Sequence, residues 1–411
     1  MIVLLSAWPL LVRAVKARGQ SLIIDWADTP TLTYHMRTDH WQQWWAGQWV
    51  GGTNFYRPIT SSIWAILYKT YGMNGLMQFD MMQAFSYIIG TVLLWVYIRA
   101  LFGRRVAMAT LVFFAVSAVE PLGLPNIHYG VHSWIDTPEQ WLLIGTIGSG
   151  LAFVIAYRQN SALAYTISLV LLAIAIGIKE AAYVTPAVLL WALWASDDLA
   201  GNWKKTLPHF AVTLVLLVYR LVIFHGHGMT YGSNRTWLVR FVTNAFGGQP
   251  LVELIQGSLD SVVVFAFLIF CGCSIALLFY RRARLAWTTL GIAAIFGALI
   301  CMDSRQLEVG IVTCAARFLF PDKGTWFPAL VQSAIPTIVV FGIWYLIGAS
   351  HDKAVWKAIV LVVILYSPLL ITASWLHVLY CDAAAWALVL ALLANHYATP
   401  ILRPLPHASA V

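Results

Sequence analysis

Residues 162–195 read ALAYTISLVLLAIAIGI KE AAYVTPAVLLWALWA, and this stretch decides the fold class. It consists of two apolar runs, Ala162 to Ile178 and Ala181 to Ala195, separated only by Lys179 and Glu180. Each run approaches the roughly 20 apolar residues that cross a bilayer as a helix. A charge inside hydrocarbon costs about 2.5–3.5 kcal/mol on insertion scales, so the Lys-Glu pair must lie at the membrane boundary or line a cavity. The stretch therefore predicts two consecutive spans.

The composition extends this prediction to the whole chain. Only 10% of the 411 residues are charged and 60% are hydrophobic, whereas a soluble globular chain carries about 25% charged residues. A water-soluble particle of this size could not cover its surface, which excludes an ordinary soluble enzyme and a disordered chain. The net charge of +8 does not indicate nucleic-acid binding, because the cations are spread over short runs between apolar stretches. The sequence predicts an all-α polytopic transmembrane bundle.

Apolar runs predict helices at 1–16, 81–101, 105–123, 141–157, 162–178, 181–196, 208–225, 258–280, 285–302, 327–349, 356–375 and 379–396, and an interfacial helix at 59–71. The first is short for a span unless it continues through Arg13, Lys16 and Arg18 with those side chains snorkelling. We expect one membrane domain of about 11–12 spans at 1–399, with further interfacial helices in its outer loops. A Pro-rich, disordered tail is expected at 400–411.

Alternating these spans places the short basic runs on one side, which the positive-inside rule identifies as the cytoplasm. The long connections 17–58, 124–140 and 226–257, and the region 303–325, then lie on the other side. Loops held by a rigid scaffold often carry chemistry. We therefore expect an integral membrane protein, of a bacterial inner membrane, with its site facing the non-cytoplasmic side.

The first long loop holds Asp25 and Asp28 among several tryptophans. Two carboxylates beside aromatic rings at a membrane surface could supply a general base or bind a divalent metal ion, and the rings could hold sugars or prenyl chains. Alternatively, the tryptophans mark the interfacial belt and the acids are simply solvated.

The second long loop holds His128 and His132, followed by Trp134. The two histidines would share one face of a helix. No HExxH motif is present, and a zinc site would need a third ligand and supporting contacts. Proton transfer or hydrogen bonding to a polar headgroup fits the pair better than a metal.

Cations embedded in apolar sequence form a further set of candidates on the same side. Lys179 and Glu180 are either a charge pair at a helix end or a contact for an anionic headgroup. Arg220 has no acid within a helical turn, so a phosphate would be a natural counter-ion, whereas snorkelling is the alternative. Arg317 is similarly placed, and His377 could join that face.

Five short motifs in order resemble the GT-C superfamily of polytopic glycosyltransferases, most closely its protein O-mannosyltransferase-like branch that often carries TPR repeats. They are Tyr56-Arg57-Pro58-Ile59-Thr60, Leu101-Phe102-Gly103-Arg104-Arg105, the loop from Asn126-Ile127-His128 to Trp134-Ile135, Ile178-Lys179-Glu180, and Arg317-Phe318-Leu319-Phe320-Pro321. The branch shows similar strips in this order, and the TPR tail is absent here.

The resemblance implies a GT-C-like topology and a transferase that uses a polyprenyl-phosphate-linked sugar from the outer leaflet. It places the base at Asp25, with Asp28 next, and the donor phosphate at Arg57, Lys179, Arg220 and Arg317. Further substrate contacts would come from Tyr56, His128, His132, Trp134, Glu180 and His377. The acceptor is not specified, and no cofactor motif is present.

The chain departs from the branch in its second loop, where Gly130 and Val131 stand near the place of a glutamate. This departure and the absent tail motivate a second hypothesis. It is a catalytically inactive GT-C-like protein that serves as a structural or lipid-binding subunit, with other membrane proteins as partners.

Overall fold

The computed structural model describes residues 2–22, 29–47, 56–118, 134, 137–224, 352–367 and 380–402. No strand occurs in these ranges, so the part of the chain that is described is an all-α polytopic helical protein. Its elements are α1 (Ile2–Lys16), α2 (Thr29–Thr38), α3 (Trp41–Trp45), α4 (Pro58–Tyr71), α5 (Leu76–Ala118), α6 (Thr137–Gln159), α7 (Ala162–Ile178), the 3₁₀ helix η3 (Glu180–Val184), α8 (Thr185–Ala195), α9 (Leu199–Asn202), the 3₁₀ helix η4 (Trp203–Thr206), α10 (Leu207–Ile223), α17 (Lys353–Tyr366) and α18 (Tyr380–Leu402).

Within the described ranges, three segments are long and apolar enough to cross a membrane: Leu76–Ala115, Thr137–Gln159 and Leu199–Ile223. The central one, α6, is enclosed by its neighbours α5 and α7. A Cβ added at Gly145 of α6 would lie 2.6 Å from the Cβ of Ala175, so this glycine permits the close approach of α7. On α7, large apolar side chains three or four residues apart point outward, as a lipid-facing helix requires: Leu163, Ile167, Val170 and Ile174.

A single glycine divides the longest helix. Within α5, Gly103 has φ 85° and ψ 174°, and the residues on both sides are helical. The sequence predicts two helices here, with the break at 102–104, and the kink confirms that break. A residue with a Cβ is strained in this conformation, which explains why the break falls at a glycine.

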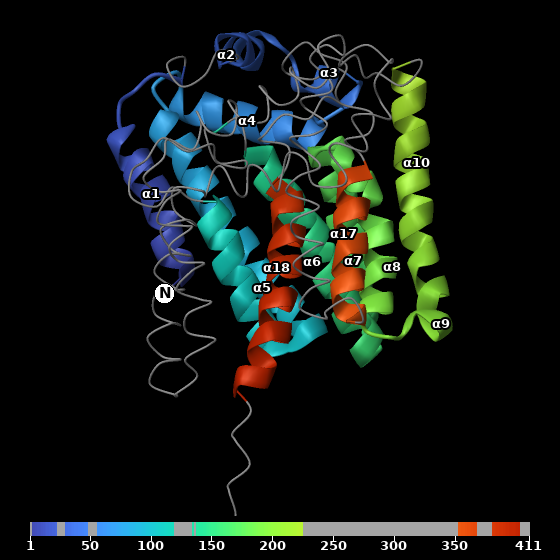
Figure 1. Ribbon diagram of the computed structural model, residues 1–411. Helices are drawn as coiled ribbons and strands as arrows, with labels where there is room; N and C mark the ends of the chain where they lie inside the picture. Colours follow the sequence, from blue (N-terminus) through green and yellow to red (C-terminus); the bar gives the residue numbers. More distant parts are fainter. Residues whose placement is uncertain are drawn as a thin grey trace, which may run out of the picture.

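Three helices between α1 and α5 lie across one end of the bundle, at the top of Figure 1. They are α2, α3 and α4, and both α2 and α3 pack on α4. Helix α4 begins with Pro58 at its first turn, a position where the missing N–H costs nothing. It coincides closely with the interfacial helix predicted at 59–71.

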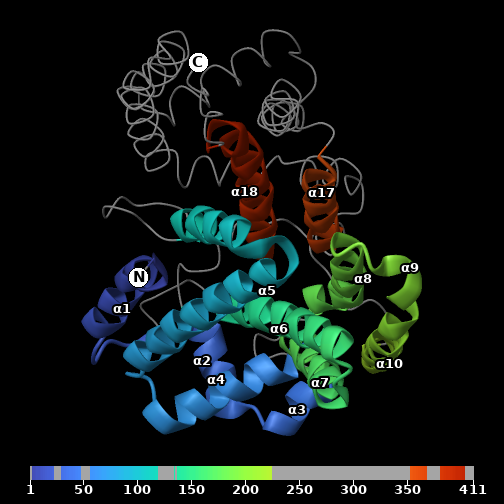
Figure 2. The ribbon, with the colours of Figure 1, turned by 90° about the horizontal axis from the view of Figure 1, so that it is seen from below.

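Helices from the C-terminal part of the chain complete the described bundle. Figure 2 shows α17 beside α8 and α18 beside α5. Helix α17 begins at Lys353, close to the span predicted from 356, and α18 continues to Leu402, past residue 396, where the sequence predicts the last span to end. The spans predicted at 258–280, 285–302 and 327–349 lie outside the described residues, as do the connections 226–257 and 303–325 and residues 403–411.

Arg13, for which the sequence offers snorkelling if the first span continues through it, contacts a second helix in the structure. Its Nη2 donates to Oδ1 of Asp80 on α5 at 3.1 Å and also contacts Oε1 of Gln83. Asp80 is 1% exposed, so the arginine compensates a buried carboxylate. The contact pins α1 to the first turns of α5.

Candidate functional site

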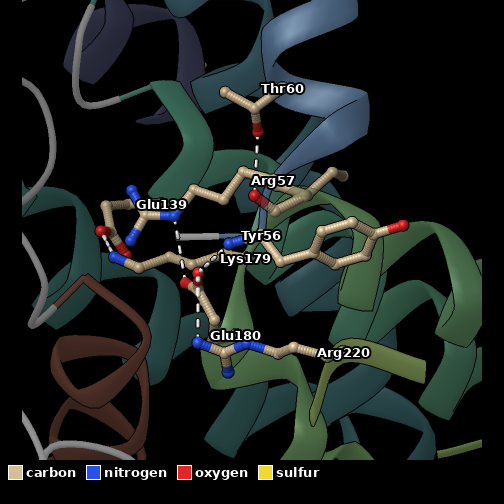
Figure 3. Close-up of polar contacts among 8 residues, drawn as sticks. Tyr56, Arg57, Thr60, Glu139, Lys179, Glu180 and Arg220 are labelled. Carbon is tan, nitrogen blue, oxygen red and sulfur yellow. Dashed lines mark hydrogen bonds and ion pairs between the residues drawn. The ribbon is translucent and has the colours of Figure 1, made fainter. Parts of the chain in front are cut away.

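The Lys-Glu pair between α7 and α8 connects two sets of charged side chains. Helix α7 ends at Ile178, and Lys179 has an extended backbone, with φ −157° and ψ 143°. Successive side chains in extended backbone point to opposite sides. Lys179 accordingly pairs with Oε1 of Glu139 on α6, whereas Glu180 turns toward Arg57 and Arg220 (Figure 3). Lys179 is therefore paired with a residue of α6, whereas Glu180 is paired with residues of α10 and of the connection before α4.

Glu180 holds together three distant parts of the chain. Its Oε2 accepts from Nε of Arg57 at 3.0 Å, and its Oε1 accepts from the backbone N–H of Tyr56, also at 3.0 Å. The Nη2 of Arg220, at the C-terminal end of α10, lies 3.9 Å from the same Oε1. Two guanidinium groups and a backbone donor favour the ionised form of this buried carboxylate.

A hydroxyl fixes the connection from which Arg57 projects. Thr60 Oγ1, in the first turn of α4, donates to the carbonyl oxygen of Ile178 at 2.9 Å. That carbonyl belongs to the last turn of α7, where the helix itself offers no donor. The bond therefore seats the start of α4 on the end of α7, directly beside Glu180.

We refer to Arg57, Glu139, Lys179, Glu180 and Arg220 as the Glu180 cluster. The ion-paired side chains in it are between 4% and 14% exposed. Three cations and two carboxylates give these five residues a net charge of +1, since 3 − 2 = 1. Buried charges are tolerated only when they are compensated, so these five residues together favour an additional anion.

Arg220 is the cation with unused donors. It is 3% exposed, interacts with Tyr183, and its guanidinium carbon lies 6.0 Å from the ring centre of Phe224. Within the described part of the chain its Nε and Nη2 have no hydrogen-bond partner. A buried guanidinium fork with free N–H groups matches the geometry of a phosphate or carboxylate.

Aromatic residues border the cluster on the side of α3 and α10. The Tyr56 ring makes edge-on contacts with Tyr219, at 5.9 Å between centres, and with Phe224, at 6.3 Å. The hydroxyls of Tyr56 and Tyr219 both donate to the carbonyl oxygen of Trp45, at 3.4 and 3.2 Å. Burial, and then the neighbouring Tyr219, raises the pKa of the Tyr56 phenol above its ordinary value. Tyr56 therefore acts as a protonated donor and not as a base.

The structure brings together five of the residues predicted from the sequence: Tyr56, Arg57, Lys179, Glu180 and Arg220. Trp134 instead lies in the aromatic core. It is fully buried and packs edge-on against Trp64 and Phe79, with ring centres 5.1 and 4.8 Å apart. The remaining predicted site residues lie outside the described part of the chain: Asp25, Asp28, His128, His132, Arg317 and His377.

Glu139 is the member of the cluster that the sequence analysis missed. It follows Pro138 in the first turn of α6, and this proline and acid are typical of a helix start. That signal predicts where the helix begins, but it does not show that the acid is buried or that Lys179 is its partner. Among the described residues, no group of three His, Cys, Asp or Glu side chains is placed to hold a metal ion.

Residues 58–225 match the family model described as dolichyl-phosphate-mannose-protein mannosyltransferase. No curated protein and no solved structure matched the chain. The matched stretch begins directly after Arg57 and contains the four other members of the Glu180 cluster. The match confirms the resemblance to GT-C glycosyltransferases over these residues and supports a membrane glycosyltransferase of this type.

Proposed function

We propose that the protein transfers a sugar from a polyprenyl-phosphate-linked donor to an acceptor on the non-cytoplasmic side of the membrane. The observation that carries the proposal is Arg220. It is a buried guanidinium with free donors, in a cluster of net positive charge. Arg57, which shares Glu180 with Arg220, contributes further positive charge. Lys179 in the same cluster and Arg317 are the other candidates. A lipid-linked phosphate is an anion that could reach such a site from within the bilayer.

The chemistry follows from what happens to the phosphate. The acceptor oxygen attacks the anomeric carbon, the bond from that carbon to the phosphate oxygen breaks, and the polyprenyl phosphate leaves. The phosphate goes from a diester with one negative charge to a monoester that carries more. Fixed cations at the phosphate stabilise this developing charge in the transition state, which is where catalysis requires it.

Asp25 is the proposed base that takes the proton from the acceptor, with Asp28 as the alternative. A base on the acceptor side and cations on the leaving-group side are complementary requirements of an inverting transfer. Tyr56, Glu180, Trp134, His128, His132 and His377 are proposed to contact or orient the substrates.

The side of transfer is inferred from the two ends of the bundle. Lys205 lies over the ring of Tyr157, and the Tyr165 hydroxyl donates to the Lys205 carbonyl. The α6–α7 connection and the basic 3₁₀ helix η4 thus lie together at one end, whereas α2, α3 and α4 cover the other (Figure 1). The positive-inside rule favours a cytoplasmic position for the basic end, and this supports a non-cytoplasmic position for the Glu180 cluster.

Replacing Arg220 tests the proposal. Arg220→Gln removes the charge and keeps polar atoms in its place, and we expect turnover of a polyprenyl-phosphate sugar to fall by about a hundredfold or more. Affinity for polyprenyl phosphate in detergent micelles should fall with it. Wild-type affinity and turnover in the Arg220→Gln protein would refute the role of Arg220 and remove the main support for the function.

Asp25→Asn separates the two hypotheses about activity. For a transferase we expect unchanged binding of polyprenyl phosphate and loss of turnover. If the wild-type protein binds the lipid phosphate but never consumes its glycosyl ester, and if it copurifies in fixed stoichiometry with other membrane proteins, the inactive lipid-binding subunit is the better account.

A further inference from the structure

One carboxylate oxygen of Glu139 is buried without a hydrogen bond from the described residues, and burying such an oxygen costs free energy. The side chain is 4% exposed, and its Oε1 pairs with Lys179. Its Oε2 is buried and has no hydrogen-bond partner within the part of the chain that is described. Leaving a charged acceptor unsatisfied costs more than leaving a neutral one. This oxygen is therefore available to a donor that the described residues do not supply.

The environment keeps Glu139 an acceptor. It lies in the first turn of α6, where the helix dipole favours a negative charge, and its partner is an ammonium group. An ionised carboxylate accepts hydrogen bonds and cannot donate them. A group that forms a hydrogen bond with Glu139 Oε2 must consequently donate an O–H or an N–H.

The unused acceptor and the unused donors belong to one connected set of side chains. Glu139 is held by Lys179, and Arg220 is paired with Glu180, the next residue along the chain (Figure 3). Lys179 and Glu180 are consecutive, with Cα atoms about 3.8 Å apart, and their side chains leave the backbone toward opposite sides. The connected set thus offers anion-binding donors on the Glu180 side and a hydrogen-bond acceptor on the Lys179 side.

We propose that Glu139 recognises a hydroxyl of the donor sugar and is a specificity-determining residue of the site. This inference rests on the proposed function, because it takes the anion held at Arg220 to be a glycosyl phosphate. A glycosyl phosphate combines, in one small group, a negative charge with several hydroxyl donors. Glu139 Oε2 accepts from one of those hydroxyls, and Lys179 positions the carboxylate for that contact.

The test compares two ligands that carry the same charge. Mannosyl decaprenyl phosphate and methyl decaprenyl phosphate are both singly charged diesters, and only the first has sugar hydroxyls. We expect the wild-type protein in detergent micelles to bind the mannosyl diester about tenfold more tightly or better, because a site built to bond a hydroxyl discriminates against ligands that lack it.

Two variants assign the preference to Glu139. Glu139→Met with Lys179→Met replaces the buried ion pair by apolar side chains of similar length, an exchange that proteins often tolerate. Glu139→Gln keeps the shape and removes only the charge. The preference should fall to about twofold or less in the double variant and should be reduced in Glu139→Gln. Asp80→Asn, which alters another buried, arginine-paired acid, should keep the preference.

The outcomes are distinct. If the wild-type protein binds both diesters equally well, or if the double variant and Glu139→Gln keep the tenfold preference, Glu139 does not read a hydroxyl and the inference is overturned. That result leaves the proposed function intact. If the folded wild-type protein binds neither diester, the proposed function itself fails. If the double variant does not fold, Glu139→Gln decides, since its unchanged preference would contradict the proposal.

Discussion

The two ends of the bundle each hold a buried cation beside an acid, but the two cations differ in how their donors are used. Arg220 at the α4 end leaves Nε and Nη2 without hydrogen bonds in the described structure, and its nearest acid lies 3.9 Å away. Lys357 at the other end donates to Oδ1 of Asp197 at 2.7 Å and to the carbonyl oxygen of Ala195 at 3.2 Å. A buried cation with engaged donors joins helices, whereas one with free donors is available to a ligand.

The two acids paired with these cations also differ, in how far they are exposed to solvent. The Glu180 side chain is 7% exposed, and that of Asp197 is 84% exposed. Water can replace Lys357 at Asp197, but water has little access to Glu180. Loss of a partner should therefore be costly in the Glu180 cluster and mild at Lys357, and three substitutions test this difference.

Glu180→Gln should have the largest effect. It removes the carboxylate that holds both Arg57 and Arg220, and breaking a buried ion pair costs about 3–5 kcal/mol. We expect a clearly lower midpoint of thermal unfolding in detergent and loss of transferase turnover. Combining it with Arg57→Gln restores the net charge to +1, since 2 − 1 = 1, and should recover part of the stability. A single variant as stable as the wild type would contradict the view that Glu180 holds the cations together.

Lys357→Met should have an intermediate effect, limited to stability. It leaves the Ala195 carbonyl without this donor and removes the ammonium that lies 5.9 Å from the Trp194 ring centre. We expect a loss of about 1–2 kcal/mol in the free energy of unfolding. Turnover per folded molecule should equal that of the wild type, measured at a temperature where both are folded. A specific loss of turnover would show that the two ends are coupled.

Asp197→Asn should have the smallest effect. A hydrogen bond from Lys357, and then its charge, lowers the pKa of the Asp197 carboxyl. The contribution of a group with a lowered pKa is complete above the unfolded value of about 3.9 and is lost as pH falls through the lower folded value. Between pH 5 and 8 the unfolding midpoints of wild type and variant should run parallel and nearly coincide, because the carboxyl is exposed and screened. A gap that opens within that range would require another titrating partner.

The sequence predicted the described spans well because each depends on a local apolar run. The start and end of α7 and the break at Gly103 fell where the runs are interrupted. The helices α2 and α3 were expected only as interfacial helices without bounds, because both sequences are short, α2 is mixed in polarity and α3 is mostly tryptophan and glutamine.

The candidate site was only partly predictable, because its contacts join residues far apart in the chain. Arg220 and Glu180 can each be identified from the sequence as a charge within an apolar run. Their contact cannot be predicted, because the two residues are 40 positions apart in the chain. The same holds for Glu139 and Lys179. The partner of Arg13, Asp80, lies 67 positions away and could not be identified from spacing either.

The corner at Gly103 has a stereochemical consequence. Its φ of 85° disfavours L-residues, yet a Cβ placed there would meet no atom within 4 Å. The restriction is thus one of handedness and not of room. A chain assembled by chemical ligation with D-alanine at this position should keep the corner, whereas L-alanine should strain it. The difference between the two chains in free energy of unfolding would measure how much this one backbone angle contributes to the stability of the helical hairpin.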